Sequence, residues 1–176
     1  MAHPIGSRLT IPTVELKRNN LLAVIPKLST TYSVKFDFKP NRFENYWNGL
    51  IQLTASQMYG SNGNVITGFY FYPSTSGYTP WLEICVGGQG SKCYDYGNHP
   101  YFIPGQWTTL ELRQYRHGVS HKVDIIVNND ETVRTYDVDP REFSNVEVFG
   151  SDRFWNASLG KMRNLVIIPN LGKIII

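Results

Sequence analysis

The stretch QWTTLELRQYRHGVSHKVDIIVNND, Gln106 to Asp130, decides the fold. Apolar side chains recur at every second position in its two arms: Leu110 and Leu112, then Val123, Ile125 and Val127. This period is expected of antiparallel strands that bury one face. Polar residues from Arg116 to Ser120 supply a turn between the arms. The stretch therefore predicts a β-hairpin, with Trp107 packing at its entry in a structural role.

Segments of the same kind lie on both sides of the hairpin, between clusters of Gly, Asn, Ser and Pro. The expected strands are Leu9–Leu16, Leu21–Ile25, Tyr32–Phe38, Leu50–Ala55, Val65–Tyr72, Trp81–Val86, Tyr101–Ile103, Thr132–Val138, Val146–Phe149 and Leu159–Ile168. Pro26 is expected to end the second strand, because proline cannot donate to a ladder interior. A single short helical turn is expected at Pro140–Phe143. The pattern predicts an all-β, antiparallel two-sheet sandwich of about a dozen strands.

A chain of 176 residues without a break in composition predicts one core and one domain. We expect an N-terminal segment or cloning remnant over 1–8, the sandwich over 9–169 and a C-terminal tail over 170–176. The apolar run Leu165–Ile168 is expected beside the N-terminal strand. The tail ends in Ile174, Ile175 and Ile176, for which an ordinary chain end is favoured over a subunit contact.

Charge and hydropathy disfavour two classes of partner. The formal net charge is +3, from 17 basic and 14 acidic residues, and no basic cluster is interleaved with aromatic residues as in nucleic-acid binders. No run of about 18 apolar residues is present, so the sequence predicts a soluble chain without a transmembrane segment.

Two features favour an oxidising, extracellular location. Cys85 and Cys93 flank the glycine-rich loop VGGQGSK, which can fold back and bring the two sulfur atoms together, so a disulfide is favoured over two separate thiols. Asn156-Ala157-Ser158 matches the N-glycosylation acceptor pattern. The sequence therefore predicts a secreted protein whose signal peptide is not present in this chain.

The sequence lacks the contiguous motifs of common enzyme classes. It has no paired-carboxylate strand, no nucleophile elbow and no His, Cys or Asp spacing typical of a metal site. We therefore predict that the chain is not an enzyme. A catalytic pair assembled from distant positions is the alternative.

Calcium is the favoured metal if one is bound, because it prefers hard oxygen ligands. The candidate ligands are Asn128, Asn129, Asp130, Glu131, Asp95 and Asn98. No EF-hand spacing is present, and an ordinary turn is the favoured interpretation of these residues.

Aromatic residues concentrated in the expected loops are the main functional signal, because ring faces stack on the apolar faces of sugars. The first-choice ligand-binding residues are Tyr78, Trp81, Tyr94, Tyr96, Asn98 and His99. The second-choice residues are Tyr46, Trp47, Phe154 and Trp155. The alternative is that these rings cap the ends of the core.

Four segments resemble jelly-roll domains of the concanavalin A-like lectin/glucanase superfamily, of the laminin-G and pentraxin kind. They are YSVKFDFKP (32–40), WNGLIQLT (47–54), PGQWTTLEL (104–112) and VEVFGSDRFWNASLGKMRNLVI (146–167). The resemblance implies two curved antiparallel sheets, adjacent termini and extracellular recognition of glycans or proteins, sometimes with calcium. The Glu, Asp, Glu strand of the glycanase branch is missing, so the resemblance does not imply hydrolysis.

Together these observations predict an extracellular, lectin-like module that recognises a glycan or a cell-surface glycoprotein. One alternative is an adhesion or matrix domain that binds protein. The other is a glycan hydrolase or lyase with dispersed catalytic residues. Self-association through an exposed sheet edge or the C-terminal tail stays open.

Overall fold

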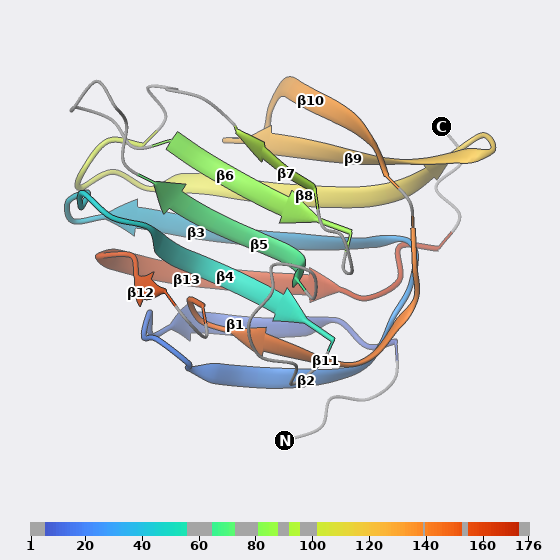
Figure 1. The fold of residues 1–176 in the computed structure, drawn as a ribbon, viewed down its shortest axis with the longest axis horizontal. Coiled ribbons are helices and arrows are strands. Elements are labelled where there is room, and N and C mark those ends of the chain that lie inside the picture. The colour runs from blue at the N-terminus through green and yellow to red at the C-terminus, as the bar shows by residue number, and fades with distance from the viewer. Residues whose placement is uncertain are drawn as a thin grey trace.

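Two β-sheets packed face to face make up the computed structural model (Figure 1). The structure describes residues 6–55, 65–72, 81–87, 92–95, 102–138, 140–152 and 155–172, with the backbone alone for 92, 95 and 130–138. Thirteen strands and no helix occur within these ranges. The predicted all-β jelly-roll sandwich is confirmed.

The first sheet, called the β3 sheet, has the strand order β1-β13-β3-β8-β9-β10. Its strands are β1 (Leu9–Val14), β3 (Tyr32–Pro40), β8 (Thr108–His117), β9 (Ser120–Val127), β10 (Asp130–Val138) and β13 (Gly160–Ile168). All pairings in it are antiparallel, and β8 and β9 form the predicted hairpin. The predicted pairing of the N-terminal strand with the C-terminal apolar run is confirmed, since β1 lies against β13.

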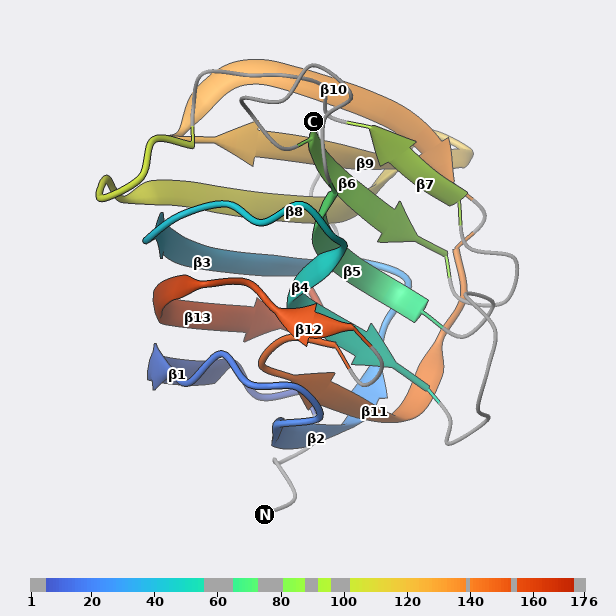
Figure 2. The ribbon, with the colours of Figure 1, turned by 60° about the vertical axis from the view of Figure 1, so that its left-hand side comes forward.

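The second sheet, called the β5 sheet, has the order β2-β11-β4-β5-β6-β7, with β12 beside β4. Its strands are β2 (Leu21–Leu28), β4 (Asn48–Thr54), β5 (Val65–Tyr72), β6 (Trp81–Val86), β7 (Lys92–Asp95), β11 (Phe143–Phe149) and β12 (Asn156–Ala157). Its pairings are antiparallel except for β12 with β4, which is parallel. Figure 2 shows the two sheets as separate layers.

The core lies between the two layers and follows from the alternation in the strands. Phe36 of β3 meets Phe69 of β5 edge to face at 5.0 Å between ring centroids, and Phe38 lies 5.7 Å from Phe71. Edge-to-face and tilted ring pairs at such distances are favourable beyond the area that they bury. The apolar face predicted for the hairpin, Leu110 included, belongs to the same buried cluster.

Trp107 lies at the hairpin entry but on the outer face of the β3 sheet, where it is half-buried. The Lys39 ammonium is 5.1 Å from its ring centroid and the Arg163 guanidinium is 4.0 Å from it. These are cation–π distances. Trp107 therefore packs between two cations and contributes little to the core.

The structure corrects four details of the predicted elements. Strand β2 runs through Pro26 to Leu28, which is possible because β2 is an edge strand paired only with β11. Pro140–Phe143 forms no helical turn, since 140–142 are irregular and β11 begins at Phe143. Phe102 and Ile103 are not in a strand, and the short strands β7 and β12 were not predicted. The proposed division of the chain at residues 9 and 169 stays a prediction.

No helix long and apolar enough to cross a membrane occurs in the described part of the chain.

Candidate functional site

The outer face of the β5 sheet carries an unusual set of side chains. In β5, Phe69 and Phe71 belong to the core, so Tyr70 and Tyr72 project to the other side of the sheet. In β6, Leu82 and Ile84 belong to the core, so Trp81, Glu83 and Cys85 project outward. The strand register then places Trp81 beside Tyr72 and Glu83 beside Tyr70.

A buried polar cluster lies on this face, and we call Gln52, Tyr70 and Asp152 the Gln52 cluster. The Gln52 Nε2 group donates to the Tyr70 hydroxyl at 3.2 Å and to the Asp152 carboxylate at 2.8 Å. The other Asp152 oxygen accepts from the Trp155 backbone N–H at 2.9 Å. All three side chains of the cluster are 5% exposed or less, so their positions are fixed by packing as well as by hydrogen bonds.

Two glycines make room for this cluster. A Cβ atom on Gly68 would lie 2.4 Å from atoms of the Tyr70 ring, so the ring lies across the glycine. A Cβ atom on Gly49 would lie 2.8 Å from the Asp152 Cβ. Both contacts are too close for any side chain, so glycine is required where the cluster meets β4 and β5.

Four aromatic rings form a continuous row beside the cluster, which we call the aromatic row: Trp155, Trp47, Tyr72 and Trp81. Adjacent ring centroids along the row are 6.1, 4.9 and 5.6 Å apart, and the Trp47 and Tyr72 rings are stacked. Trp47 also packs against a small buried group that contains Tyr70. Trp155 is 47% exposed at one end, so the row offers an open ring face next to buried polar groups.

The electrostatics keep Tyr70 neutral. Burial, and then the charge of Asp152, raise the pKa of its hydroxyl well above the ordinary value, against the hydrogen bond from Gln52, which lowers it. Glu83 raises this pKa further. The face also holds two buried polar atoms without a hydrogen-bond partner among the described residues, Gln52 Oε1 and Trp81 Nε1. A buried acceptor and a buried donor of this kind are capable of binding a ligand hydroxyl.

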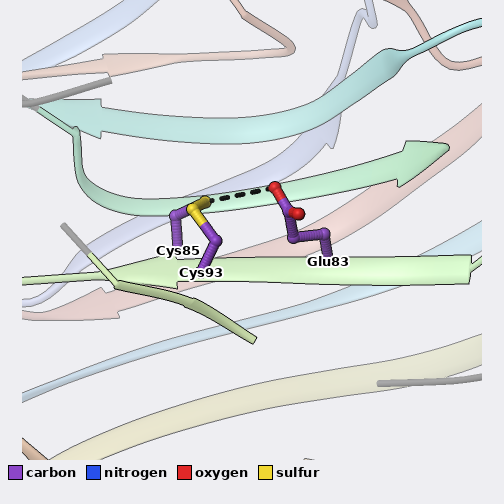
Figure 3. A group of neighbouring side chains, drawn as sticks. All are labelled: Glu83, Cys85 and Cys93. Atoms are coloured by element: carbon purple, nitrogen blue, oxygen red, sulfur yellow. Dashed lines mark hydrogen bonds between the residues drawn. A yellow bond between two sulfur atoms is a disulfide. The ribbon is translucent and has the colours of Figure 1, made fainter. Parts of the chain in front are cut away.

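The predicted disulfide between Cys85 and Cys93 is confirmed (Figure 3). It joins residues that face each other across β6 and β7, with 4.0 Å between their Cα atoms. Glu83 Oε1 is 3.5 Å from Cys85 Sγ. These three residues are the one group of described side chains close enough together to hold a metal ion, but sulfur atoms in a disulfide present no thiolate ligand.

The structure brings three of the predicted site residues together, since Trp81, Trp47 and Trp155 all belong to the aromatic row. Tyr94 packs against the core instead, and Tyr46 is exposed beside Glu44. Five others lie outside the described residues: Tyr78, Tyr96, Asn98, His99 and Phe154. A ligand-binding role for the ten residues stays a prediction.

Sequence reasoning missed the Gln52 cluster and Tyr72. The alternation in GFYFY was a usable signal, because it places Tyr70 and Tyr72 opposite the core residues Phe69 and Phe71. No local pattern could have found Asp152, which reaches Gln52 across 100 positions of sequence.

The calcium candidates that the structure describes serve a turn. Asn128 and Asn129 both have positive φ angles, and the Asn128 Oδ1 atom accepts from the Thr109 N–H at 3.0 Å. The Asn129 Oδ1 atom accepts from the Lys35 ammonium at 3.1 Å. The other candidate side chains, of Asp130, Glu131, Asp95 and Asn98, are not among those described.

Asn156 is exposed in β12, where the oligosaccharide of an N-linked site could be accommodated. Glycosylation at this position stays a prediction.

No protein-family model matches the chain, and no curated protein matches its sequence. Solved structures match its fold. A native heptameric SAP-like pentraxin from Limulus polyphemus is 17% identical with a TM-score of 0.56, over 94% of this chain and 77% of that chain. An alginate lyase from Alteromonas sp. 272 is 11% identical with a TM-score of 0.51, over 94% and 90%. A polysaccharide lyase of family 18, aly-SJ02, is 10% identical with a TM-score of 0.50, over 93% and 90%. These matches confirm the concanavalin A-like fold that the sequence suggested.

The two lyase matches overturn the prediction that the chain is not an enzyme. That prediction rested on the absence of contiguous motifs. A sheet face of this fold collects residues from strands far apart in sequence, as it does for Gln52, Tyr70 and Asp152, so missing motifs do not exclude glycan chemistry.

Proposed function

We propose that the chain is an extracellular, glycan-active domain that binds a polysaccharide along the aromatic row of the β5 sheet. The observation that carries the proposal is the continuous row of four rings next to the Gln52 cluster. The disulfide supports an oxidising location. Fold neighbours described as a pentraxin and as alginate lyases are consistent with a glycan ligand.

The chemistry of the face suits a sugar chain. The exposed Trp155 ring can stack on the apolar face of a pyranose, and packing by Trp47 holds it in place. Gln52 Oε1 and Trp81 Nε1 supply an acceptor and a donor without a partner among the described residues. Sites that bind small polar ligands combine aromatic surface with a few fixed polar groups in this way.

A glycan array with and without calcium, comparing the unmodified protein with Trp155→Ala, tests the proposal. Loss of one stacking ring, worth about 1 kcal/mol, should weaken binding about fivefold while the melting temperature stays the same. Leu21→Ala is the matched control, because Leu21 is 49% exposed but lies on the edge strand β2. Binding that survives Trp155→Ala unchanged would place the site elsewhere.

Cleavage of the bound glycan is a second candidate function. Two carboxylates, of Asp152 and Glu83, act on the Tyr70 hydroxyl from the same face, and carboxylates are the usual groups of glycoside hydrolysis. Incubation with polysaccharides, followed by measurement of new reducing ends and of unsaturated ends, tests this function. Unsaturated ends would show a lyase, reducing ends alone a hydrolase, and neither would exclude cleavage of the polymers tested.

A further inference from the structure

The charges at the aromatic row are negative. Glu83 lies directly beside Tyr70 across the β5–β6 register, and Asp152 is held at 2.8 Å by Gln52. Both carboxylates raise the pKa of Tyr70, which shows that their fields reach its hydroxyl. Asp152 is only 2% exposed, so solvent screens its charge weakly.

Basic side chains gather on the opposite surface of the molecule. In β3, the core residues Val34, Phe36 and Phe38 alternate with Lys35 and Lys39, which therefore project from the outer face of the β3 sheet. The cross-strand partners of this row add further cations to that face: Arg113, Lys161 and Arg163. The net charge of +3 is thus distributed away from the aromatic row.

The described cation nearest the row is already paired. Arg42 acts on the Tyr46 hydroxyl together with Glu44, and its guanidinium is 3.7 Å from the Glu44 carboxylate. The described part of the face therefore offers acceptors and one indole donor, Trp81 Nε1, but no unpaired cation to neutralise a ligand carboxylate.

We infer that the aromatic row takes a neutral glycan and excludes polymers of uronic acids; this inference rests on the proposed function. Hydroxyl groups of a neutral sugar can donate to Gln52 Oε1 and to the carboxylates, and can accept from Trp81 Nε1. A uronate would place a third negative charge next to Glu83 and Asp152. Because β-elimination requires a carboxyl group next to the proton that is removed, any cleavage by this site is hydrolytic.

Matched polymers that differ only in charge test the inference. Polygalacturonate is compared with its fully methyl-esterified form, and alginate with carboxyl-reduced alginate, by isothermal titration calorimetry at low and high salt. We expect each neutral form to bind at least tenfold more tightly than its charged parent. Added salt should narrow that difference, because it screens the repulsion.

A variant ties the discrimination to a particular charge. Glu83→Gln should reduce the ratio of neutral to charged affinity several-fold, whereas the control Glu142→Gln, whose carboxylate pairs with Lys27 at 2.9 Å away from the row, should leave the ratio unchanged. Melting temperatures establish that both variants are folded. If Glu83→Gln does not fold, the salt series on the unmodified protein provides the same test.

Each outcome is decisive. A charged polymer that binds as tightly as its neutral partner, or a ratio that neither Glu83→Gln nor salt affects, overturns the inference but leaves glycan binding intact. Failure of every glycan on an array, neutral and charged alike, overturns the proposed function and with it the inference.

Discussion

At the scale of single residues, the candidate site depends on side chains that are absent as much as on those present. Gly49 and Gly68 bring Asp152 and the Tyr70 ring into contact with the backbone of β4 and β5. Only then do the Tyr70 hydroxyl and the Asp152 carboxylate both come within reach of Gln52 Nε2. Glycine at these two positions is therefore part of the site, although it contributes no functional group.

Gly68→Ala tests this dependence. The new methyl group would lie 2.4 Å from the Tyr70 ring, so the ring must move and the Gln52–Tyr70 hydrogen bond should break. We expect a loss of about 1–3 kcal/mol in the free energy of unfolding, measured in urea. In a Tyr70→Ala background the same change should cost much less, since the clashing ring is gone. Additive costs in the double variant would contradict the close contact.

Tyr32 predicts a loss of stability at alkaline pH. Burial raises the pKa of its hydroxyl to about 12, against the Thr67 hydrogen bond at 2.6 Å, which lowers it. Because the folded value lies above the ordinary 10.0, the neutral form favours folding. Its contribution is complete below pH 10 and is lost as pH rises toward 12, amounting to about 3 kcal/mol.

Unfolding free energies measured between pH 8 and pH 12 for the unmodified protein and for Tyr32→Phe check this prediction. The variant should lose part of the alkaline decline, and Tyr70→Phe a further part, since the pKa of Tyr70 is raised in the same direction. Parallel curves for the unmodified protein and Tyr32→Phe would show that Tyr32 is not the group responsible.

At the scale of elements, strands with one buried face were predictable and their neighbours were not. Alternation identified β3, β8 and β9, because each buries every second residue. It misplaced the end of β2, since the effect of Pro26 depends on whether the strand has one partner or two. It missed β7, whose four residues carry too short a pattern. Trp47 and Trp155 were predicted site residues, but only the pairing of β12 with β4 explains why they meet.

The disulfide should stabilise the edge of the β5 sheet. It ties the edge strand β7 to β6 and closes a loop of eight sequence steps, worth about 2.5 kcal/mol on the chain-entropy model. Reduction should lower the free energy of unfolding by about that amount. The Cys85→Ser/Cys93→Ser double variant should match the reduced protein and should not respond to reductant. A fully reduced protein, verified by thiol titration, with an unchanged melting temperature would disprove the contribution.

At the scale of the whole molecule, long-range pairing builds both the fold and the candidate site. Strand β13, near the C-terminus, lies between β1 and β3, so the β3 sheet is complete only when the last strand is in place. The Gln52 cluster likewise joins β4 and β5 to the segment after β11. Local patterns could therefore predict the class of fold, whereas the grouping of the functional side chains required the topology.

Removal of β1 is the sharpest test of this architecture. Deleting residues 1–14 would remove the partner of β13 from Leu9–Ile167 to Val14–Met162 and leave its N–H and C=O groups unpaired at a new sheet edge. Leu9 and Val14 are also core residues, so we expect lower stability together with self-association through the exposed β13. Sedimentation velocity and thermal unfolding measure the two effects. The control Thr10→Ala/Thr13→Ala changes two exposed side chains of β1 but keeps its backbone, and it should stay monomeric and stable. A monomeric deletion variant with the stability of the control would mean that β1 adds nothing to the sheet that it completes.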